Sequence, residues 1–138
     1  MDKQQKILII DDDPDFVESI SHILKAKSYD VIVAENGEEG IQKIRSEKPD
    51  LVLLDILMPK KDGYLVADEI SKDSQISNIP VLALTSVIET LGPPPFPFNV
   101  SGYLQKSVSP ADLLTNIEKF LNPTEGSDKQ QNSRYVFP

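Results

Sequence analysis

The sequence has no cysteine, only one histidine and no long apolar run. Without cysteine the chain can form no disulfide, zinc–thiolate site or thiol nucleophile, and this agrees with a reducing compartment. The first apolar run, residues 7–10, is followed at once by aspartates, so it is too short for a signal peptide or a membrane span. We expect no chemical role for His22, which falls within the first predicted helix. The sequence therefore predicts a cytoplasmic protein with no membrane partner.

Basic side chains are also scarce, because 14 lysines and arginines stand against 22 aspartates and glutamates, for a formal net charge of −8. An acidic chain of this kind binds polyanions poorly, so we expect no direct nucleic-acid ligand. The 138 residues suffice for one domain with its own core and leave no room for a second. We place that domain at residues 1–122, because the polar and aperiodic stretch 123–138 is predicted to be a flexible tail.

Short apolar runs rich in Ile, Val and Leu alternate with segments of helical period. The runs are residues 7–10, 31–34, 51–54, 81–84 and 103–104. The first four are continuous rather than alternating, which is typical of strands buried on both faces of a parallel sheet. Apolar stripes at helical spacing begin at Phe16, Ile41, Leu65 and Leu113. The alternation predicts an α/β fold, with an open parallel sheet, right-handed crossovers and helices on both faces.

Capping signals mark two of the predicted helices. Pro14 follows Asp13, and Pro110 follows Ser109. In each pair a capping side chain stands directly before a proline that suits the first helical position. A cap fully explains Asp13, so we assign it no role in chemistry.

The stretch between the fourth and fifth apolar runs cannot be helical throughout. Residues 92–98 read GPPPFPF, and each interior proline costs a helix about 3 kcal/mol because it removes a donor and clashes with the preceding turn. We therefore expect the fourth helix to be shortened or replaced by a proline-rich loop. Two alternatives stay open: Phe96 and Phe98 pack into the groove that the helix would cover, or the loop recognises a partner in polyproline-II form.

Candidate site residues follow the first, third, fourth and fifth apolar runs. They are Asp11, Asp12, Asp55, Thr85 and Lys106. Since ligands bind beyond the carboxyl ends of the strands in open α/β sheets, we expect these side chains to meet at one place. Three carboxylates at close range repel one another unless a cation intervenes, and Mg²⁺ suits carboxylate oxygens together with a phosphate. A carboxylate in such a site can attack phosphorus and form an aspartyl phosphate, which an ammonium and a hydroxyl would help to stabilise.

Four motifs at these positions resemble the receiver domain of two-component response regulators, the CheY-like superfamily. They are ILIIDDDP, LVLLDILMPKKDG, LALTS and GYLQK. The resemblance covers residues 5 to 121 and implies a flavodoxin-like, doubly wound five-stranded parallel sheet in the order 2-1-3-4-5. It implies that Asp55 is the phosphoacceptor. It also implies that Asp11 and Asp12, with Asp55 and the backbone carbonyl of Leu57, hold Mg²⁺ or Mn²⁺.

The same resemblance implies roles for three further residues. Lys106 would contact the phosphoryl group, Thr85 would be the hydroxyl that moves toward it on activation, and Tyr103 matches the aromatic switch position. The implied function is a bacterial phosphoacceptor signalling domain rather than an enzyme, although it assists its own phosphorylation and dephosphorylation. Its partners would be a sensor histidine kinase or phosphotransfer protein, which supplies the phosphoryl group from a phosphohistidine, and a downstream protein that it contacts.

The chain departs from the family at Lys106-Ser107, where the family usually has Lys-Pro with a cis bond. A cis bond before a residue other than proline costs about 2.5–4 kcal/mol, so we expect a trans bond here and expect Lys106 still to reach the phosphoryl site. Leu57 and Val87, each two residues beyond a site residue, are apolar and cannot orient a hydrolytic water. We therefore expect slow self-dephosphorylation.

Two alternatives to the phosphoacceptor function stay open. One is a degenerate receiver that binds partners without being phosphorylated, a reading that Ser107 and the altered fourth helix favour. The other is a haloacid-dehalogenase-type phosphatase, which Asp11-x-Asp13 resembles. That class also needs an acidic metal pair after its lysine, and only the isolated Asp112 follows Lys106 within the predicted domain.

Overall fold

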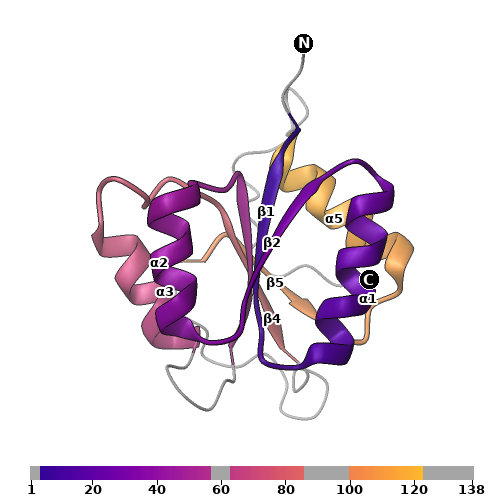
Figure 1. The fold of residues 1–138 in the computed structure, drawn as a ribbon, viewed down its shortest axis with the longest axis horizontal. Helices are drawn as coiled ribbons and strands as arrows, with labels where there is room; N and C mark the ends of the chain where they lie inside the picture. The colour runs from indigo at the N-terminus through magenta and orange to yellow at the C-terminus, as the bar shows by residue number, and fades with distance from the viewer. Residues whose placement is uncertain (1–3, 57–62, 86–99, 123–138) are drawn as a thin grey trace.

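The computed structural model describes residues 4–56, 63–85 and 100–122, and Figure 1 shows their arrangement. The strands are β1 Lys6–Ile10, β2 Asp30–Ala34, β3 Leu51–Asp55, β4 Val81–Thr85 and β5 Gly102–Gln105. The helices are α1 Pro14–Ala26, α2 Gly37–Glu47, α3 Gly63–Lys72 and α5 Pro110–Leu121. The strands form one parallel sheet in the order β2-β1-β3-β4-β5. The predicted α/β fold and strand order are therefore confirmed.

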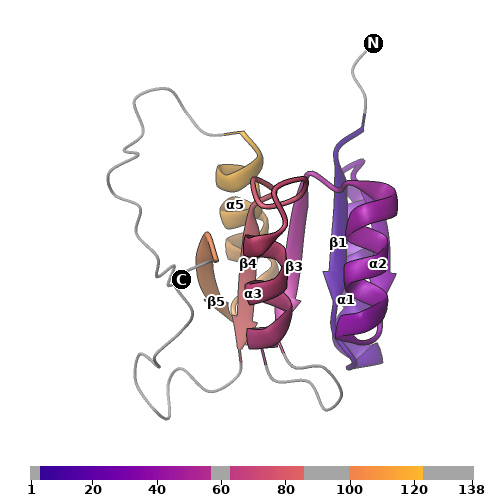
Figure 2. The same cartoon turned by 90° about the vertical axis from the view of Figure 1, so that its left-hand side faces the viewer.

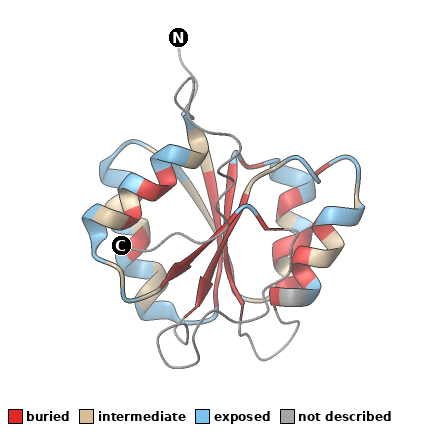
Figure 3. Ribbon diagram, turned by 180° about the vertical axis from the view of Figure 1, so that it is seen from behind, coloured by how far each residue is buried: buried red, intermediate tan, exposed pale blue. Residues whose placement is uncertain are grey.

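Helices cover both faces of the sheet. In Figure 1, α2 and α3 lie on one side and α1 and α5 on the other. In β1, Leu8 and Ile10 face α2 and α3, whereas Ile7 and Ile9 face α1 and α5. Figure 3 shows β3, β4 and β5 as buried along their length, whereas most of β2, at the edge of the sheet, is of intermediate burial. Burial on both faces explains why the strand sequences are continuously apolar.

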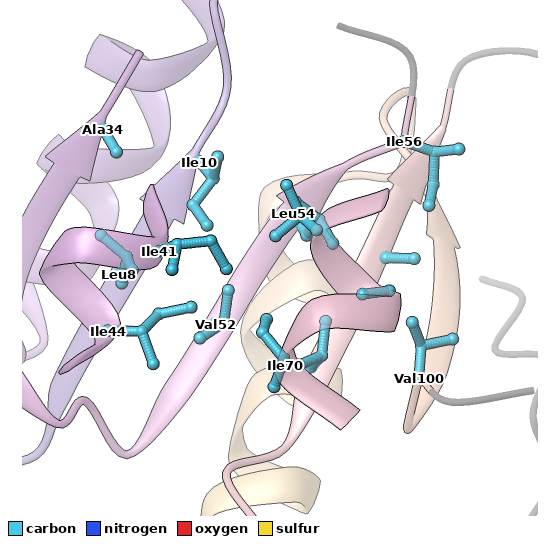
Figure 4. Close-up of a cluster of buried hydrophobic side chains, with 14 of the residues drawn as sticks. Leu8, Ile10, Ala34, Ile41, Ile44, Val52, Leu54, Ile56, Ile70 and Val100 are labelled. Carbon is cyan, nitrogen blue, oxygen red and sulfur yellow. The ribbon is translucent and has the colours of Figure 1, made fainter. Parts of the chain in front are cut away.

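Two apolar clusters result, one on each face of the sheet. The α2–α3 cluster, drawn in part in Figure 4, includes Leu8, Ile10, Ile41, Ile44, Val52, Leu54, Val66, Ile70, Ala83 and Tyr103. The α1–α5 cluster includes Ile7, Ile9, Ile20, Leu24, Leu53, Leu82, Leu84, Leu104, Leu113 and Ile117. The same strands contribute to both clusters through alternate side chains, so the sheet is the shared wall of the two cores.

The helix caps are those that the sequence predicts. Asp13 Oδ1 accepts hydrogen bonds from the backbone N–H groups of Asp15 (3.1 Å) and Phe16 (3.4 Å), and Pro14 opens α1. Ser109 caps α5 in the same way, because its hydroxyl accepts from the backbone N–H of Asp112 at 3.2 Å. Each cap satisfies N–H groups that have no partner within the helix.

Several predictions concern segments that lie outside the described residues. They are the altered fourth helix with its 92–98 loop, the carbonyl of Leu57, the side chain of Val87 and the tail 123–138. Within the described ranges, no helix has both the length and the apolar character needed to cross a membrane.

Candidate functional site

The carboxyl ends of the strands bring three aspartates together. Figure 2 shows that the arrowheads of β1, β3 and β4 point toward the same edge of the sheet. Because Ile10 pairs with Leu54 in parallel register, the residues that follow β1 come to lie beside the end of β3. Carboxylate oxygens of Asp11, Asp12 and Asp55 lie within 4.8 Å of one another. The structure therefore brings together the three side chains that the sequence predicts as metal ligands.

Asp11 is fixed by two hydrogen bonds, but one of its two carboxylate oxygens accepts no hydrogen bond within the described part of the chain. Its backbone N–H donates to the Ala34 carbonyl (3.1 Å), and its Oδ1 accepts from the Asp13 N–H (2.9 Å). Its Oδ2 is buried and accepts no hydrogen bond from the described residues, although the Lys106 ammonium lies 2.9 Å away in an ion pair. Buried polar atoms are normally hydrogen-bonded, so this oxygen marks a place for a further positive partner.

The donor set fits a hard divalent cation. Three carboxylates supply only oxygen ligands, which Mg²⁺ and Mn²⁺ prefer. Asp11 and Asp55 are buried, whereas Asp12 is exposed, so an ion there would meet protein on one side and solvent on the other. Asp13 is excluded from the group, because its carboxylate caps α1.

Lys106 is the cation that the described residues supply to this site. Its Nζ lies 2.9 Å from Asp11 Oδ2 and 3.5 Å from Asp55 Oδ2, and its side chain is 18% exposed. Burial by itself lowers the pKa of Lys106, but the Asp11 and Asp55 carboxylates outweigh burial and raise the pKa above its ordinary value. The ammonium therefore stays charged beside the buried carboxylates.

The backbone around Lys106 fixes where that side chain starts. The Lys106 N–H donates to the Thr85 carbonyl at 2.8 Å, which extends the pairing of β4 with β5. The peptide bond to Ser107 is trans, as expected. The Ser107 hydroxyl donates to Gln105 Oε1 at 3.2 Å across the turn. The lysine reaches the Asp55 carboxylate without a proline after it.

Thr85 and Tyr103 lie on the same face of the sheet, because alternation along β4 puts Thr85 on the side of Ala83, which belongs with Tyr103 to the α2–α3 cluster. Thr85 ends β4 and is buried next to the strand that leads to Lys106. Tyr103 is 2% exposed and belongs to the α2–α3 cluster. Buried packing is thus part of the role of Tyr103, and its role as a switch stays a prediction.

Sequence reasoning overlooked two residues that contact the site. A Cβ on Gly63 would overlap the Asp55 carbonyl oxygen and the Ile56 backbone, so α3 can begin against β3 only with glycine there. The motif LVLLDILMPKKDG ends on this glycine, so a signal was available in the sequence. The other residue is Phe16, whose ring centroid lies 4.7 Å from Lys106 Nζ. Its position in the first turn after the aspartates was an available signal.

The geometry combines a nucleophile, a cation and a metal-binding group. Asp55 offers a carboxylate oxygen at the edge of the sheet, and Lys106 places positive charge beside it. Phosphoryl transfer needs positive charge around the oxygens of the transferred group rather than elaborate covalent chemistry. The site is therefore chemically suited to carrying a phosphoryl group on a carboxylate.

The model of the response regulator receiver domain family matches residues 7–118 of the chain. The chain therefore belongs to this family of signalling domains, which are not enzymes in the ordinary sense.

Curated relatives agree with this assignment. The alkaline phosphatase synthesis transcriptional regulatory protein PhoP of Bacillus subtilis (strain 168) is 33% identical over 125 residues, which cover 88% of this chain and 50% of that protein. The probable transcriptional regulator ycf27 of Porphyridium aerugineum is 33% identical over 130 residues, or 94% of this chain and 53% of that protein. The chain thus spans about half the length of these relatives.

A solved structure of the same family has the same fold. The CheY-like response regulator receiver domain protein from Methanospirillum hungatei JF-1 superposes with a TM-score of 0.74 at 26% identity, covering 87% of this chain and 95% of that one. The chemotaxis protein CheY4 of Vibrio cholerae gives a TM-score of 0.74 at 25% identity, covering 86% of this chain and all 100% of that one.

Proposed function

We propose that this domain accepts a phosphoryl group on Asp55 from the phosphohistidine of a sensor histidine kinase or a phosphotransfer protein. An Asp55 Oδ attacks phosphorus, the P–N bond of the phosphohistidine breaks, and the imidazole nitrogen keeps the electron pair and takes up a proton. The observation that carries the proposal is the buried Asp55 carboxylate, which shares its site with Asp11, Asp12 and the Lys106 ammonium.

Each residue at the site has a part in this proposal. Asp11, Asp12 and Asp55 would hold Mg²⁺ or Mn²⁺, with the carbonyl of Leu57 as a further ligand. A divalent cation supplies positive charge against the oxygens of the transferred group. Lys106 turns its ammonium from Asp55 to a phosphoryl oxygen once the carboxylate is modified. The hydroxyl of Thr85 donates to another phosphoryl oxygen and moves toward it.

The phosphorylated domain would signal by contact with a downstream protein, with Tyr103 following Thr85 as the switch. Because the kinases of two-component systems transfer their phosphoryl group in the cytoplasm, we propose that this protein is cytoplasmic. The domain would span residues 1–122, followed by the tail 123–138. Any further activity of a longer protein is open, since the relatives are about twice as long.

Acetyl phosphate with Mg²⁺ tests the phosphoacceptor directly. We expect intact-mass measurement to show one added phosphoryl group on the wild type, removed by hydroxylamine, and none on Asp55→Asn. The Asp55→Asn protein must keep its thermal unfolding transition, because a loss of fold would also prevent modification. A wild type that stays unmodified would contradict the proposal and favour a receiver that binds partners without phosphorylation.

The phosphatase alternative makes a different prediction for the same sample. It needs Asp13 as a second catalytic carboxylate, but Asp13 caps α1. Turnover of a phosphate ester that stops in Asp11→Asn would support the phosphatase. We expect no turnover.

Magnesium binding is tested with two adjacent, exposed aspartates. Asp12 lies in the carboxylate group and Asp13 lies outside it, so they form a matched pair. We expect Mg²⁺ at ten times its dissociation constant to stabilise the wild type by about 1.4 kcal/mol, by mass action on the folded state. Asp12→Asn should lose most of this gain. Asp13→Asn should keep it, and its starting stability should be nearly that of the wild type, because asparagine caps a helix about as well as aspartate.

A further inference from the structure

The Lys106 ammonium has an aromatic neighbour as well as two carboxylate partners. Its Nζ lies 4.7 Å from the centroid of the Phe16 ring, within the range of a cation–π interaction. Phe16 is in the first turn of α1, whereas Lys106 follows β5 at the other end of the domain sequence. Only the fold brings the ring and the ammonium together.

The position of the ring is determined by the start of α1. Asp13 accepts from the Phe16 N–H at 3.4 Å, so the cap fixes the backbone from which the ring projects. The ring is half-buried and packs against the α1–α5 cluster. Asp13 therefore supports Lys106 indirectly, through the helix turn that carries Phe16.

The ammonium has room to leave this position. A cavity of about 170 Å³ between α1 and α5 is lined by Phe16, Ile20, Leu84, Lys106, Val108 and Leu113 among others. A lysine side chain has several rotatable bonds and borders open space here, so its two ionic contacts alone do not define a single conformation. The face of a half-buried ring restricts that freedom through its quadrupole.

We propose that Phe16 is a positioning residue, whose ring keeps the Lys106 ammonium beside Asp55 while the ionic partners of that ammonium change. The ionic contacts depend on the charge at Asp11 and Asp55, and phosphorylation alters the group at Asp55. The ring contact depends on neither carboxylate. The Lys106 ammonium therefore keeps its position beside residue 55 in both the free and the phosphorylated site. This inference rests on the proposed phosphoacceptor function of Asp55.

Two substitutions separate the ring face from simple packing. Phe16→Leu keeps an apolar side chain in the cluster but removes the ring, and Phe16→Tyr keeps the ring. With acetyl phosphate and Mg²⁺, we expect Phe16→Leu to be phosphorylated about three to ten times more slowly, in line with the strength of partly buried cation–π contacts. We expect Phe16→Tyr to be modified at nearly the wild-type rate.

Phe120→Leu is the matched control for this experiment. Phe120 is another half-buried ring that packs on the α1–α5 cluster, and it belongs to α5 rather than to the site. We expect Phe120→Leu to change the phosphorylation rate less than twofold. A second control is Lys106→Ala, in which Phe16→Leu should cause no further slowing because the ammonium is already gone.

A measurement on the free protein tests the contact without any reaction. In NMR spectra of protein with labelled lysine, the ring current of Phe16 should displace the Lys106 side-chain methylene signals. We expect this displacement to vanish in Phe16→Leu and to persist in Phe16→Tyr. The measurement needs neither metal nor phosphodonor, so it stands even if Asp55 is not the phosphoacceptor.

The outcomes distinguish the inference from the function on which it rests. Absence of phosphate on the wild type would overturn the proposed function, and the proposal for Phe16 as a positioning residue with it. If the wild type is phosphorylated, a Phe16→Leu protein as fast as the wild type would overturn the inference alone. So would a Phe16→Tyr protein as slow as Phe16→Leu, equal slowing by Phe16→Leu in the Lys106→Ala background, or unchanged Lys106 signals in Phe16→Leu.

Discussion

The two faces of the sheet share the same strands but differ in what they place beside the site. On one face, α2 and α3 pack on the α2–α3 cluster, which Figure 4 draws in part and whose buried members are at most 5% exposed. On the other, α1 and α5 leave a cavity of about 170 Å³ that borders Lys106 and Phe16. Close packing stabilises a core, whereas unfilled space allows a side chain to move.

The difference separates two tasks within one small domain. The α2–α3 face contributes stability and supports the backbone of Asp55, because α3 begins directly against the end of β3 at Gly63. The α1–α5 face carries the cation of the site and the ring beneath it. A lysine that must change its partners is thus placed beside unfilled space.

The largest expected effect concerns the cores themselves. Ile44 is fully buried in the α2–α3 cluster, whereas Ile20 already lines the cavity on the other face. We expect Ile44→Ala to lower the free energy of unfolding by about 4 kcal/mol and Ile20→Ala by about 2 kcal/mol, within the usual range for isoleucine truncation. Urea unfolding measures both. Equal losses would show that the two faces are equally well packed.

The next effect compares two glycines of the α2–α3 face. A Cβ on Gly40 would meet the end of the flexible Ile10 side chain at 2.6 Å, whereas a Cβ on Gly63 would meet backbone atoms of Asp55 and Ile56. We therefore expect Gly63→Ala to cost about 3 kcal/mol and Gly40→Ala about 1 kcal/mol. Thermal or urea unfolding checks the stability.

The same pair also tests the link between this face and the site. Gly63→Ala should slow modification by acetyl phosphate, because relief of the clash moves the end of β3 and so the Asp55 carboxylate. Gly40→Ala should leave the rate nearly unchanged. Slowing by both variants to the same degree would mean that lost stability, rather than displacement of Asp55, is the cause.

The smallest expected effect is a difference in pH dependence. Since the carboxylates raise the pKa of Lys106 above 10.5, its stabilising contribution is complete below that pH and is lost as pH rises through the higher folded value. On the other face, the Gln75 N–H and the Arg45 guanidinium hold the pKa of Asp73 below 3.8. The contribution of Asp73 is complete above 3.8 and is lost as pH falls through the lower folded value.

Substitutions at the two groups separate these dependences. Lys106→Met should flatten the alkaline fall in stability, and Asp73→Asn should flatten part of the acid fall. Urea unfolding across the pH range measures both. If Lys106→Met loses stability above pH 10.5 as steeply as the wild type, a group other than Lys106 causes the alkaline loss of stability.

Much of the fold could be predicted from local patterns in the sequence. Continuous apolar runs identified the strands because both faces of each strand are buried, and the caps at Asp13 and Ser109 identified the starts of two helices. The strand order came from the resemblance to a family, because order across a sheet depends on contacts between distant segments. Burial of Tyr103 in the α2–α3 cluster could not be predicted from its neighbours in the sequence.

The site was predictable in its members but not in its internal contacts. Asp11, Asp12 and Asp55 follow strands whose carboxyl ends must share an edge, so their approach followed from the parallel sheet alone. The choice between the roles of Asp13 and Asp12 also followed, because a helix needs one cap. The contact of Phe16 with Lys106 could not be predicted, since it joins α1 to the turn after β5 through the packing of side chains.

By itself the sequence determined which segments are strands, where the acidic groups stand relative to them, and that no cysteine chemistry is possible. Those properties depend on short-range alternation, chain direction and residue type. Only the tertiary structure decided that one carboxylate oxygen of Asp11 is buried without a hydrogen bond from the described residues. It also decided that Lys106 bridges two carboxylates above an aromatic ring, and that the cavity lies on the same side of the sheet as Lys106. These features arise where residues distant in sequence pack together, and packing is a property of the whole fold.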